Sequence, residues 1–140
     1  MARMIVLLSI LASSALATGG PGDNAIGRWQ TETKHGIVEV SACGASICGR
    51  LLESDKIRAN PQLRDEKNKN PAQRDRVLKG LLMLQGFKAH NGEWTGGTIY
   101  NADDGGTYQA TLTPVDRDTL KVKGCIVWPL CKSQIWKRAK

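Results

Sequence analysis

The chain has 140 residues, which is enough for one domain but not for two. Its formal net charge is +7, because 20 Lys and Arg residues outnumber 13 Asp and Glu residues. Such a balance favours anionic partners, among them lipid headgroups, cell-wall polymers or an acidic small molecule, although charge also serves solubility alone.

The first 17 residues differ from the rest of the chain. Arg3 precedes an apolar run over residues 4–11, and small residues then lead to Ala17. This pattern is typical of a secretory signal peptide, with cleavage after Ala17. A membrane anchor is the alternative, but a spanning helix needs about 20 apolar residues. We therefore expect an exported protein, periplasmic or secreted, that does not span the membrane once processed and has no nucleic-acid partner.

Residues 18–25 predict a flexible leader, and residues 26–140 predict the folded domain. The first strand is expected over 27–33, and a turn at His35 and Gly36 leads into a second strand over 37–42. Alternation along the second strand places Val38 and Val40 toward a core. Residues 43–48 then form a hairpin turn, and 49–53 form the return strand.

Residues 55–79 form a long polar excursion rather than a strand. The segment carries eight Lys or Arg and four Asp or Glu residues, with Asn-Pro steps at Asn60 and Asn70. We expect one helical turn over 71–78, because proline suits a first helical position. Loops of this length are often functional or mobile.

Beyond the excursion, the chain again predicts strands. These are expected over 81–89, 94–100, 107–113, 119–125 and 133–138. Asn91 and Gly92 give a strong hairpin signal between the first two. Alternation predicts that Trp94, Gly96, Thr98 and Tyr100 share one face of the second, that Tyr108, Ala110 and Leu112 share one face of the third, and that Leu120 and Val122 point inward from the fourth.

Eight strands joined mostly by tight turns form either a sandwich or an up-and-down barrel. We favour an all-β, eight-stranded antiparallel up-and-down barrel, because closure removes exposed edges and leaves room for side chains or one small ligand.

The four cysteines fall into two close pairs, Cys43 with Cys48 and Cys125 with Cys131. In an exported domain an even number of cysteines indicates disulfides. Four cysteines allow three pairings, and the local pairing needs least from the fold. The spacings do not fit a zinc site, so we expect no metal.

Gly27 and Trp29 open the first strand, and Arg138 closes the last. This resembles the signature of the lipocalins and fatty-acid-binding proteins, the calycins, in which an arginine covers a strand-one tryptophan through a cation–π contact. The resemblance implies structural roles for Gly27, Trp29 and Arg138, and we also expect a structural role for Trp136 on the last strand.

The mature chain is also similar, over nearly its whole length, to the family named domain of unknown function 2147, whose members are small exported bacterial proteins with a lipocalin-like barrel. The matching blocks are Gly27-Arg28-Trp29, Cys43-x4-Cys48-Gly49-Arg50, Asn70-Pro71-x-x-Arg74-x-Arg76-x-x-x-Gly80-Leu81, Trp94-x-Gly96-Gly97-x-Ile99-Tyr100-Asn101, Asp104-Gly105-Gly106-x-Tyr108, Leu120-Lys121-Val122-Lys123-Gly124-Cys125 and Ser133-Gln134-Ile135-Trp136. Ala102 stands where a proline is more usual. The resemblance implies a fold and an exported location, but no reaction.

Two groups of residues are candidates for ligand binding. Asn70, Arg74 and Arg76 lie on the excursion, where guanidinium groups suit a carboxylate or phosphate; the structural alternative is that Asn70 caps a turn and the arginines pair with Asp75 or cover the barrel end. Trp94, Tyr100 and Tyr108 are expected to line a cavity or to fill the core.

Signals for catalysis are weak. The sequence has no Gly-x-Ser-x-Gly or His-Glu-x-x-His motif. His35 and His90 lie beside turn glycines, and the acidic turn at Asp103 and Asp104 lacks the full calcium-loop pattern. We expect no enzyme and no cofactor.

Three functions remain open. The first is a binding protein that holds a small amphipathic or acidic ligand, with residues 70–76 at the mouth of the barrel. The second is a structural or interaction protein of the cell envelope, with a filled barrel and a basic surface. A hydrolase is the third and the least favoured.

Overall fold

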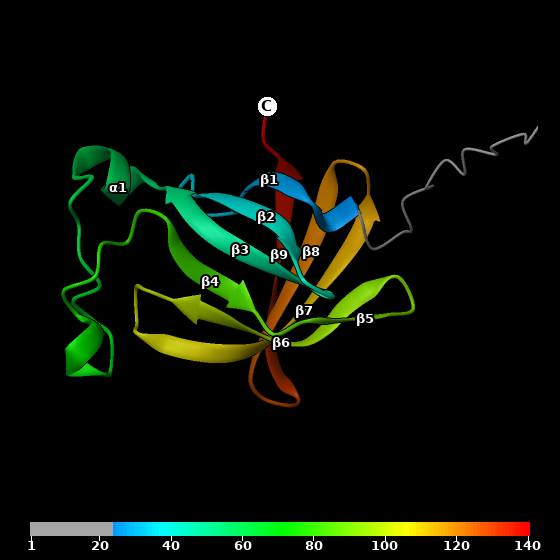
Figure 1. Cartoon of the computed structure of the whole chain (residues 1–140). Coiled ribbons are helices and arrows are strands. Elements are labelled where there is room, and N and C mark those ends of the chain that lie inside the picture. Colours follow the sequence, from blue (N-terminus) through cyan, green and yellow to red (C-terminus); the bar gives the residue numbers. More distant parts are fainter. Residues whose placement is uncertain (1–23) are drawn as a thin grey trace, which may run out of the picture.

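The computed structural model describes residues 24–140, so the expected signal peptide, 1–17, and residues 18–23 of the expected leader lie outside the described residues. The strands are β1 Gly27–Gln30, β2 Ile37–Cys43, β3 Ser46–Glu53, β4 Leu81–Gln85, β5 Lys88–His90, β6 Glu93–Asn101, β7 Gly106–Asp116, β8 Thr119–Val127 and β9 Leu130–Arg138 (Figure 1). The helices are α1 Asp55–Ala59 and the short 3₁₀ helix η2 Pro71–Gln73.

The strands form one antiparallel sheet in the order β4-β3-β2-β1-β9-β8-β7-β6-β5, and an additional pairing between β4 and β6 closes it. Within the described residues, eight strands therefore make a closed up-and-down barrel, as predicted. β5 is an extra strand that pairs with β6. The single strand expected over 81–89 was wrong, because Gly86, with φ of +79°, and the buried Phe87 separate β4 from β5.

The barrel core follows the predicted alternation along the strands. Val38, Val40, Leu120 and Val122 are all buried. The core also contains Ala25, Trp29, Ile47, Leu84, Phe87, Trp94, Ala110, Leu112 and Trp136. Ala25 was expected in the leader, but it is fully buried, and its carbonyl oxygen accepts a hydrogen bond from Trp29 Nε1 at 2.8 Å.

The prediction that Trp94, Gly96, Thr98 and Tyr100 share one face was wrong. The register between β6 and β7 shifts between Trp94 and Gly97, at a bulge where Gly96 has φ of +70°. A bulge inserts one extra residue and reverses the alternation beyond it. Ile99 consequently packs against the barrel core, and Tyr100, as its neighbour in the strand, points to the other face.

Arg138 covers Trp29 where β9 meets β1. Its guanidinium carbon lies 4.0 Å from the centroid of the indole, and its Nη1 donates to the carbonyl oxygen of Ile26 at 2.6 Å. A Cβ added to Gly27 would lie 2.3 Å from this Nη1, and Gly27 has φ of +128°. Glycine is therefore the residue that lets the guanidinium approach.

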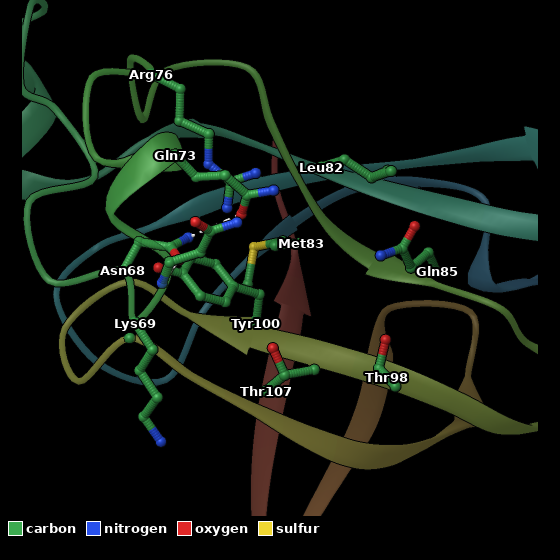
Figure 2. Close-up of a pocket in the computed structure, with 12 residues that line it drawn as sticks. Asn68, Lys69, Gln73, Arg76, Leu82, Met83, Gln85, Thr98, Tyr100 and Thr107 are labelled. Carbon is green, nitrogen blue, oxygen red and sulfur yellow. Dashed lines mark hydrogen bonds between the residues drawn. The ribbon is translucent and has the colours of Figure 1, made fainter.

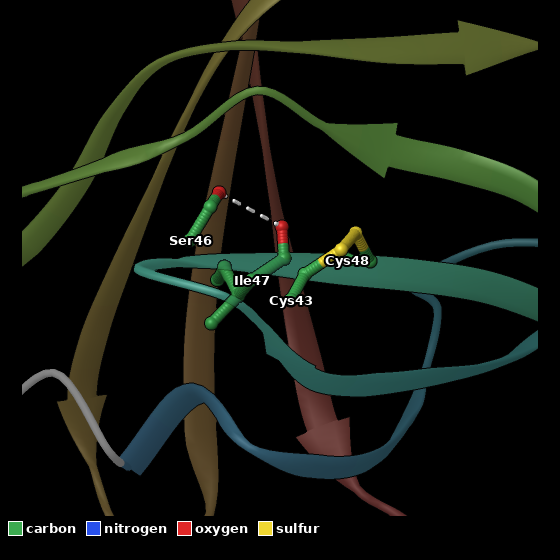
Figure 3. The surroundings of a disulfide bond; sticks show 4 residues. All are labelled: Cys43, Ser46, Ile47 and Cys48. Carbon is green, nitrogen blue, oxygen red and sulfur yellow. Dashed lines mark hydrogen bonds between the residues drawn. A yellow bond between two sulfur atoms is a disulfide. The ribbon is translucent and has the colours of Figure 1, made fainter.

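Two disulfides close hairpins, and both have the local pairing. Cys43 is bonded to Cys48 across the β2–β3 turn, where Ser46 and Ile47 lie inside the loop (Figure 3). Cys125 is bonded to Cys131 across the β8–β9 turn. The disulfides fit a protein that resides in an oxidising compartment.

The polar excursion lies at one end of β3, β4, β6 and β7 (Figure 1). α1 was not expected; its N-cap is Ser54, whose side chain accepts from the backbone N–H of Ile57. The helical turn expected over 71–78 is shorter, because η2 ends at Gln73 and a β-bridge joins Arg64 to Val77. Below the excursion, Ile57, Leu78 and Leu81 form a second small core.

No helix of the described chain has the length and apolar character that a membrane crossing requires.

Candidate ligand-binding site

A cavity of about 400 Å³ lies between the excursion and the strands β4, β6 and β7 (Figure 2). Its lining comes from residues far apart in the sequence: Asn68, Lys69, Asn70, Gln73, Arg76, Leu82, Met83, Gln85, Thr98, Tyr100, Gly105 and Thr107. None of the buried residues of the barrel core is among them. The cavity is thus formed beside the barrel core and not within it.

The buried carboxylate of Asp65 connects the excursion to β6 on one side of the cavity. The side chain of Asp65 is completely buried, and its oxygens accept hydrogen bonds from Tyr100 Oη at 2.6 Å and from Arg76 Nε at 2.8 Å. Asn68 Nδ2 donates to the same carboxylate at 2.8 Å. A buried charge is tolerated only when it is paired and hydrogen-bonded. Asp65 meets that condition, because two groups from the excursion and one from β6 donate to it.

These contacts shift the pKa values of Asp65 and Tyr100 in opposite directions. Burial alone would raise the pKa of Asp65, but the hydrogen bonds from Tyr100, Asn68 and Arg76 outweigh it and hold that pKa below its ordinary value. Burial and the hydrogen bond to Asp65 raise the pKa of Tyr100 to about 12. At neutral pH the network therefore consists of a carboxylate, a neutral phenol and a guanidinium.

The backbone of the excursion is tied to the same group. Asp65 N–H donates to the carbonyl oxygen of Arg76 at 2.9 Å, and Arg74 Nε donates to the carbonyl oxygen of Asn68 at 2.8 Å. Asn70 caps η2 by accepting from the N–H of Ala72 at 3.1 Å. The loop is thereby held in one shape, so the groups it presents to the cavity are preorganised.

Close backbone packing joins the excursion to the β6–β7 turn. A Cβ added to Gly105 would lie 1.9 Å from the carbonyl oxygen of Lys67, and Gly105 has φ of +71°. Both the space and the backbone conformation require glycine at this position.

The lining combines cationic, polar and apolar groups. Lys69 and Arg76 carry positive charge, and no acidic side chain is among the described residues that line the cavity. The guanidinium carbon of Arg76 lies 5.3 Å from the centroid of the Tyr100 ring, and 36% of the Arg76 side chain remains exposed. Leu82 and Met83 add an apolar wall from β4. Such a cavity suits an anionic head with a small apolar part.

The six ligand-binding candidates from the sequence are only partly brought together. Asn70, Arg76 and Tyr100 line the cavity. Arg74 does not line it and instead holds the Asn68 carbonyl. Trp94 is buried in the barrel core, and Tyr108 donates from Oη to Asp104 in the β6–β7 turn at 2.6 Å.

Several polar residues of the site were missed by the sequence reasoning. They are Asp65, Asn68, Lys69 and Gln73 on the excursion and Gln85, Thr98 and Thr107 on the strands. The partners of Asp65 lie 11 and 35 residues away, so no local spacing marks it. The available signal is its position directly after Arg64 in the long polar segment 55–79.

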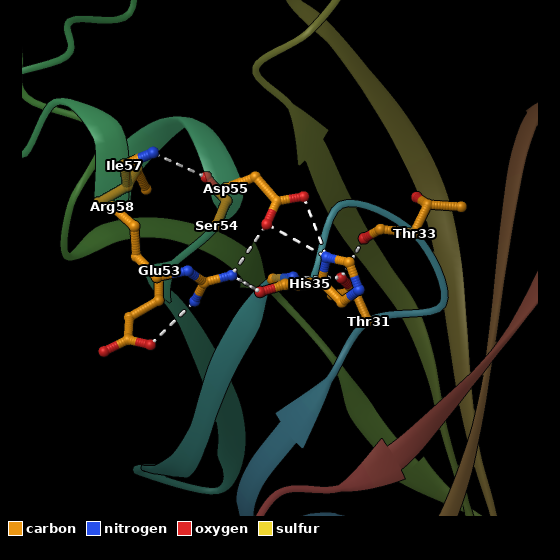
Figure 4. A network of polar contacts seen from close by, with 9 residues as sticks. Thr31, Thr33, His35, Glu53, Ser54, Asp55, Ile57 and Arg58 are labelled. Carbon is orange, nitrogen blue, oxygen red and sulfur yellow. Dashed lines mark hydrogen bonds and ion pairs between the residues drawn. The ribbon is translucent and has the colours of Figure 1, made fainter.

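A second polar cluster joins α1 to the β1–β2 turn and is exposed to solvent (Figure 4). Asp55 lies 3.0 Å from His35 Nδ1, and Arg58 donates to the carbonyl oxygen of His35 at 2.7 Å and to Glu53 at 3.1 Å. The hydrogen bond with His35 lowers the pKa of Asp55. These contacts fasten the helix to the barrel.

The acidic β6–β7 turn is engaged by protein groups. Asp103 pairs with Lys34 and with Lys56, while Asp104 accepts from Tyr108. Across residues 24–140, no cluster of three or more His, Cys, Asp or Glu side chains has the arrangement of a metal site.

The fold is similar to that of a solved structure from Helicobacter pylori. That structure is described as "Protein HP1028 from the human pathogen Helicobacter pylori belongs to the lipocalin family"; it superimposes with a TM-score of 0.74 at 24% sequence identity, over 82% of each chain. At this identity the likeness shows the fold, a lipocalin-like barrel. No curated protein matches the sequence.

The family relationship is shown by the sequence over almost the whole described domain. Residues 27–138 match the model of a family described as "Uncharacterized protein conserved in bacteria (DUF2147)". The match covers more than half of the chain and includes every strand of the barrel. The chain belongs to the DUF2147 family.

Proposed function

We propose that this protein is an exported, periplasmic or secreted, binding protein without catalytic activity, and that it holds a small acidic ligand in the cavity beside the barrel. The observation that carries the proposal is the position of Arg76. Its Nε is fixed on the buried Asp65, and the guanidinium lines the cavity together with Lys69.

The cavity has the size and chemistry for such a ligand. Its volume of about 400 Å³ lies within the range of small-molecule sites. A carboxylate or phosphate head would meet Arg76 and Lys69, with the side-chain amides of Gln73 and Gln85 as further donors, while Asn68 donates to Asp65 and Gln73. Leu82 and Met83 would contact a short apolar tail.

The lipocalin-like fold supports the proposal in a general way, because barrels of this kind commonly hold small ligands. The contribution of this chain is the excursion, which adds a polar wall to the outside of the barrel.

The test compares two probes, decanoate and the neutral decanol, by following amide signals in NMR titrations. Decanoate is expected to shift the side-chain amide signals of Asn68, Gln73 and Gln85. Decanol lacks the anionic head and is expected to bind at least about tenfold more weakly, since a hydrogen bond to a charged group contributes roughly 1.5–3 kcal/mol.

Arg76→Gln and Arg64→Gln are the matched variants. Both remove a guanidinium from the excursion, but Arg64 does not line the cavity and pairs with the exposed Asp75. Arg76→Gln should weaken decanoate binding by roughly tenfold or more, and Arg64→Gln should leave it unchanged. Equal binding of decanoate and decanol, equal binding by both variants, or the absence of any shift would overturn the proposal.

A further inference from the structure

The hairpin between β8 and β9 ends in an exposed apolar loop, residues 126–130, which we call the apolar tip. The exposed fractions are 74% for Ile126, 61% for Val127, 80% for Trp128 and 65% for Leu130. In Figure 1 the loop projects from the sheet at the bottom of the view. Adjacent large apolar side chains with such exposure mark an interaction surface.

The barrel does not need this loop for its own core. Trp29, Trp94 and Trp136 are buried in the core, whereas Trp128 is not. The other disulfide-closed hairpin turns through Gly44 and Ala45 and places Ile47 in the core. A short hairpin of this fold can therefore be closed by a disulfide without exposing apolar side chains.

The two strands that carry the tip have basic but no acidic side chains over residues 119–140, and two of the lysines lie close to the tip. Residues 119–140 contain six basic residues and no acidic residue. Lys132 pairs with Gly124 and Lys123 with Ser133, so both lysines lie within two ladder positions of the disulfide that closes the tip. A second cavity, of about 310 Å³, is lined by both Lys123 and Trp128, which brings a cation and an indole to the same space.

The size and chemistry of this surface favour a lipid bilayer over a protein. The tip has five residues, whereas a stable protein interface uses roughly 20–30 residues a side. An apolar tip with a tryptophan, backed by lysines, is the combination that binds membrane interfaces: indoles lie at headgroup level, and lysines near the surface are attracted by anionic lipids.

We propose that the apolar tip docks this protein on a bilayer that contains anionic phospholipids, with Ile126, Val127 and Trp128 in the interface and Lys123 and Lys132 facing the headgroups. The Cys125–Cys131 disulfide limits the freedom of the loop before it binds, which lowers the ordering cost of docking. The proposal is independent of the cavity beside the barrel.

The experiment measures flotation of the full chain with vesicles of phosphatidylglycerol and phosphatidylethanolamine, and with vesicles of phosphatidylcholine. The matched variants are Val127→Ser and Val115→Ser, because Val115 is 58% exposed on β7, close to the 61% of Val127. A third variant combines Val127→Ser with Trp128→Ser. The wild type and all variants carry the same N-terminal segment. Any contribution of that segment to vesicle binding is therefore equal among them, and differences in binding report on the apolar tip.

The expected result is binding to the anionic vesicles that weakens at least about tenfold in the double variant and is unchanged in Val115→Ser. Replacing Lys123 or Lys132 by Gln should weaken it by about fivefold each. Because the other tryptophans are buried, acrylamide quenching of the fluorescence reports mainly on Trp128 and should decrease when vesicles bind.

Several results would overturn the proposal. They are equal binding by wild type and the double variant, equal binding to neutral vesicles, or quenching of Trp128 that vesicles do not change. If sedimentation velocity shows a dimer that the double variant loses, while vesicles do not bind, the tip is an interface between copies of the chain instead. Circular dichroism checks that each variant is folded.

Discussion

The barrel and the excursion are stabilised in different ways. In the described residues, the barrel core contains thirteen buried hydrophobic residues, whereas the core below the excursion contains three. The excursion has a small apolar core and is held mainly by polar contacts. The hydrogen bonds of the buried Asp65 are at the centre of these contacts. Apolar packing tolerates many substitutions of similar volume, but a buried carboxylate depends on each of its few partners. The region that forms the candidate site is thus the region whose shape depends on few residues.

The largest effect is expected from the barrel core. Trp29→Ala removes a fully buried indole and the contact with Arg138, and should lower the free energy of unfolding by about 3–5 kcal/mol. Urea unfolding measures the change, with Val115→Ala as an exposed control expected to stay within about 0.5 kcal/mol. A loss of stability that is confined to the excursion and leaves the barrel unchanged would contradict the proposed difference between the two regions.

Asp65→Asn should act on the excursion first. The amide keeps the shape but loses the charge that faces Arg76. Because the Arg76 side chain is 36% exposed, its charge keeps access to water, and the cost is about 1–3 kcal/mol. Hydrogen exchange should become faster at the backbone amides of Asp65 and Leu78 and stay slow in the barrel core. Asp75→Asn is the control, because the Asp75 side chain is 94% exposed. Uniformly faster exchange would show that the excursion is not a separate unit.

Gly105→Ala tests how closely the excursion packs against the β6–β7 turn. Its Cβ would collide with the Lys67 carbonyl oxygen, whereas Gly44, with φ of +64°, has open space around it. Gly44→Ala should therefore cost only the backbone strain, about 1–2 kcal/mol, and Gly105→Ala clearly more. Equal urea midpoints for the two variants would contradict the close packing of the excursion on the β6–β7 turn.

The smallest effect concerns alkaline pH. The folded-state pKa of Tyr100, about 12, is above the unfolded value near 10. The resulting stabilisation is fully present below about pH 10 and is lost as the pH rises toward about 12. Its size is about 1 kcal/mol after allowance for solvent screening. Tyr100→Phe should remove this dependence in urea unfolding between these pH values, and an unchanged slope would show that Tyr100 does not hold the excursion.

The sequence predicted the barrel better than the site. Strand alternation placed Val38, Val40, Leu120 and Val122 in the core, because one side of each strand is buried. It was wrong at β6, where the Gly96 bulge reverses the faces and moves Tyr100 out of line with Trp94. A bulge is a one-residue event that alternation alone does not reveal.

The site was predicted in part because its contacts are long-range. The arginines and Asn70 stood out by composition, and Arg76 and Asn70 do line the cavity. Asp65 was missed, since its partnership with Tyr100 spans 35 residues and depends on how the excursion folds back. Arg74 lies two residues before Arg76, but it donates to the Asn68 carbonyl oxygen and not to the buried Asp65.

Native mass spectrometry of the protein recovered from an exporting host tests the central claim most directly, with wild type, Arg76→Gln and Arg64→Gln measured before and after solvent stripping. The account predicts a bound small-molecule mass on wild type and Arg64→Gln that disappears on stripping and is absent from Arg76→Gln. The bare chain mass in all three, or the same bound mass in all three, would contradict it.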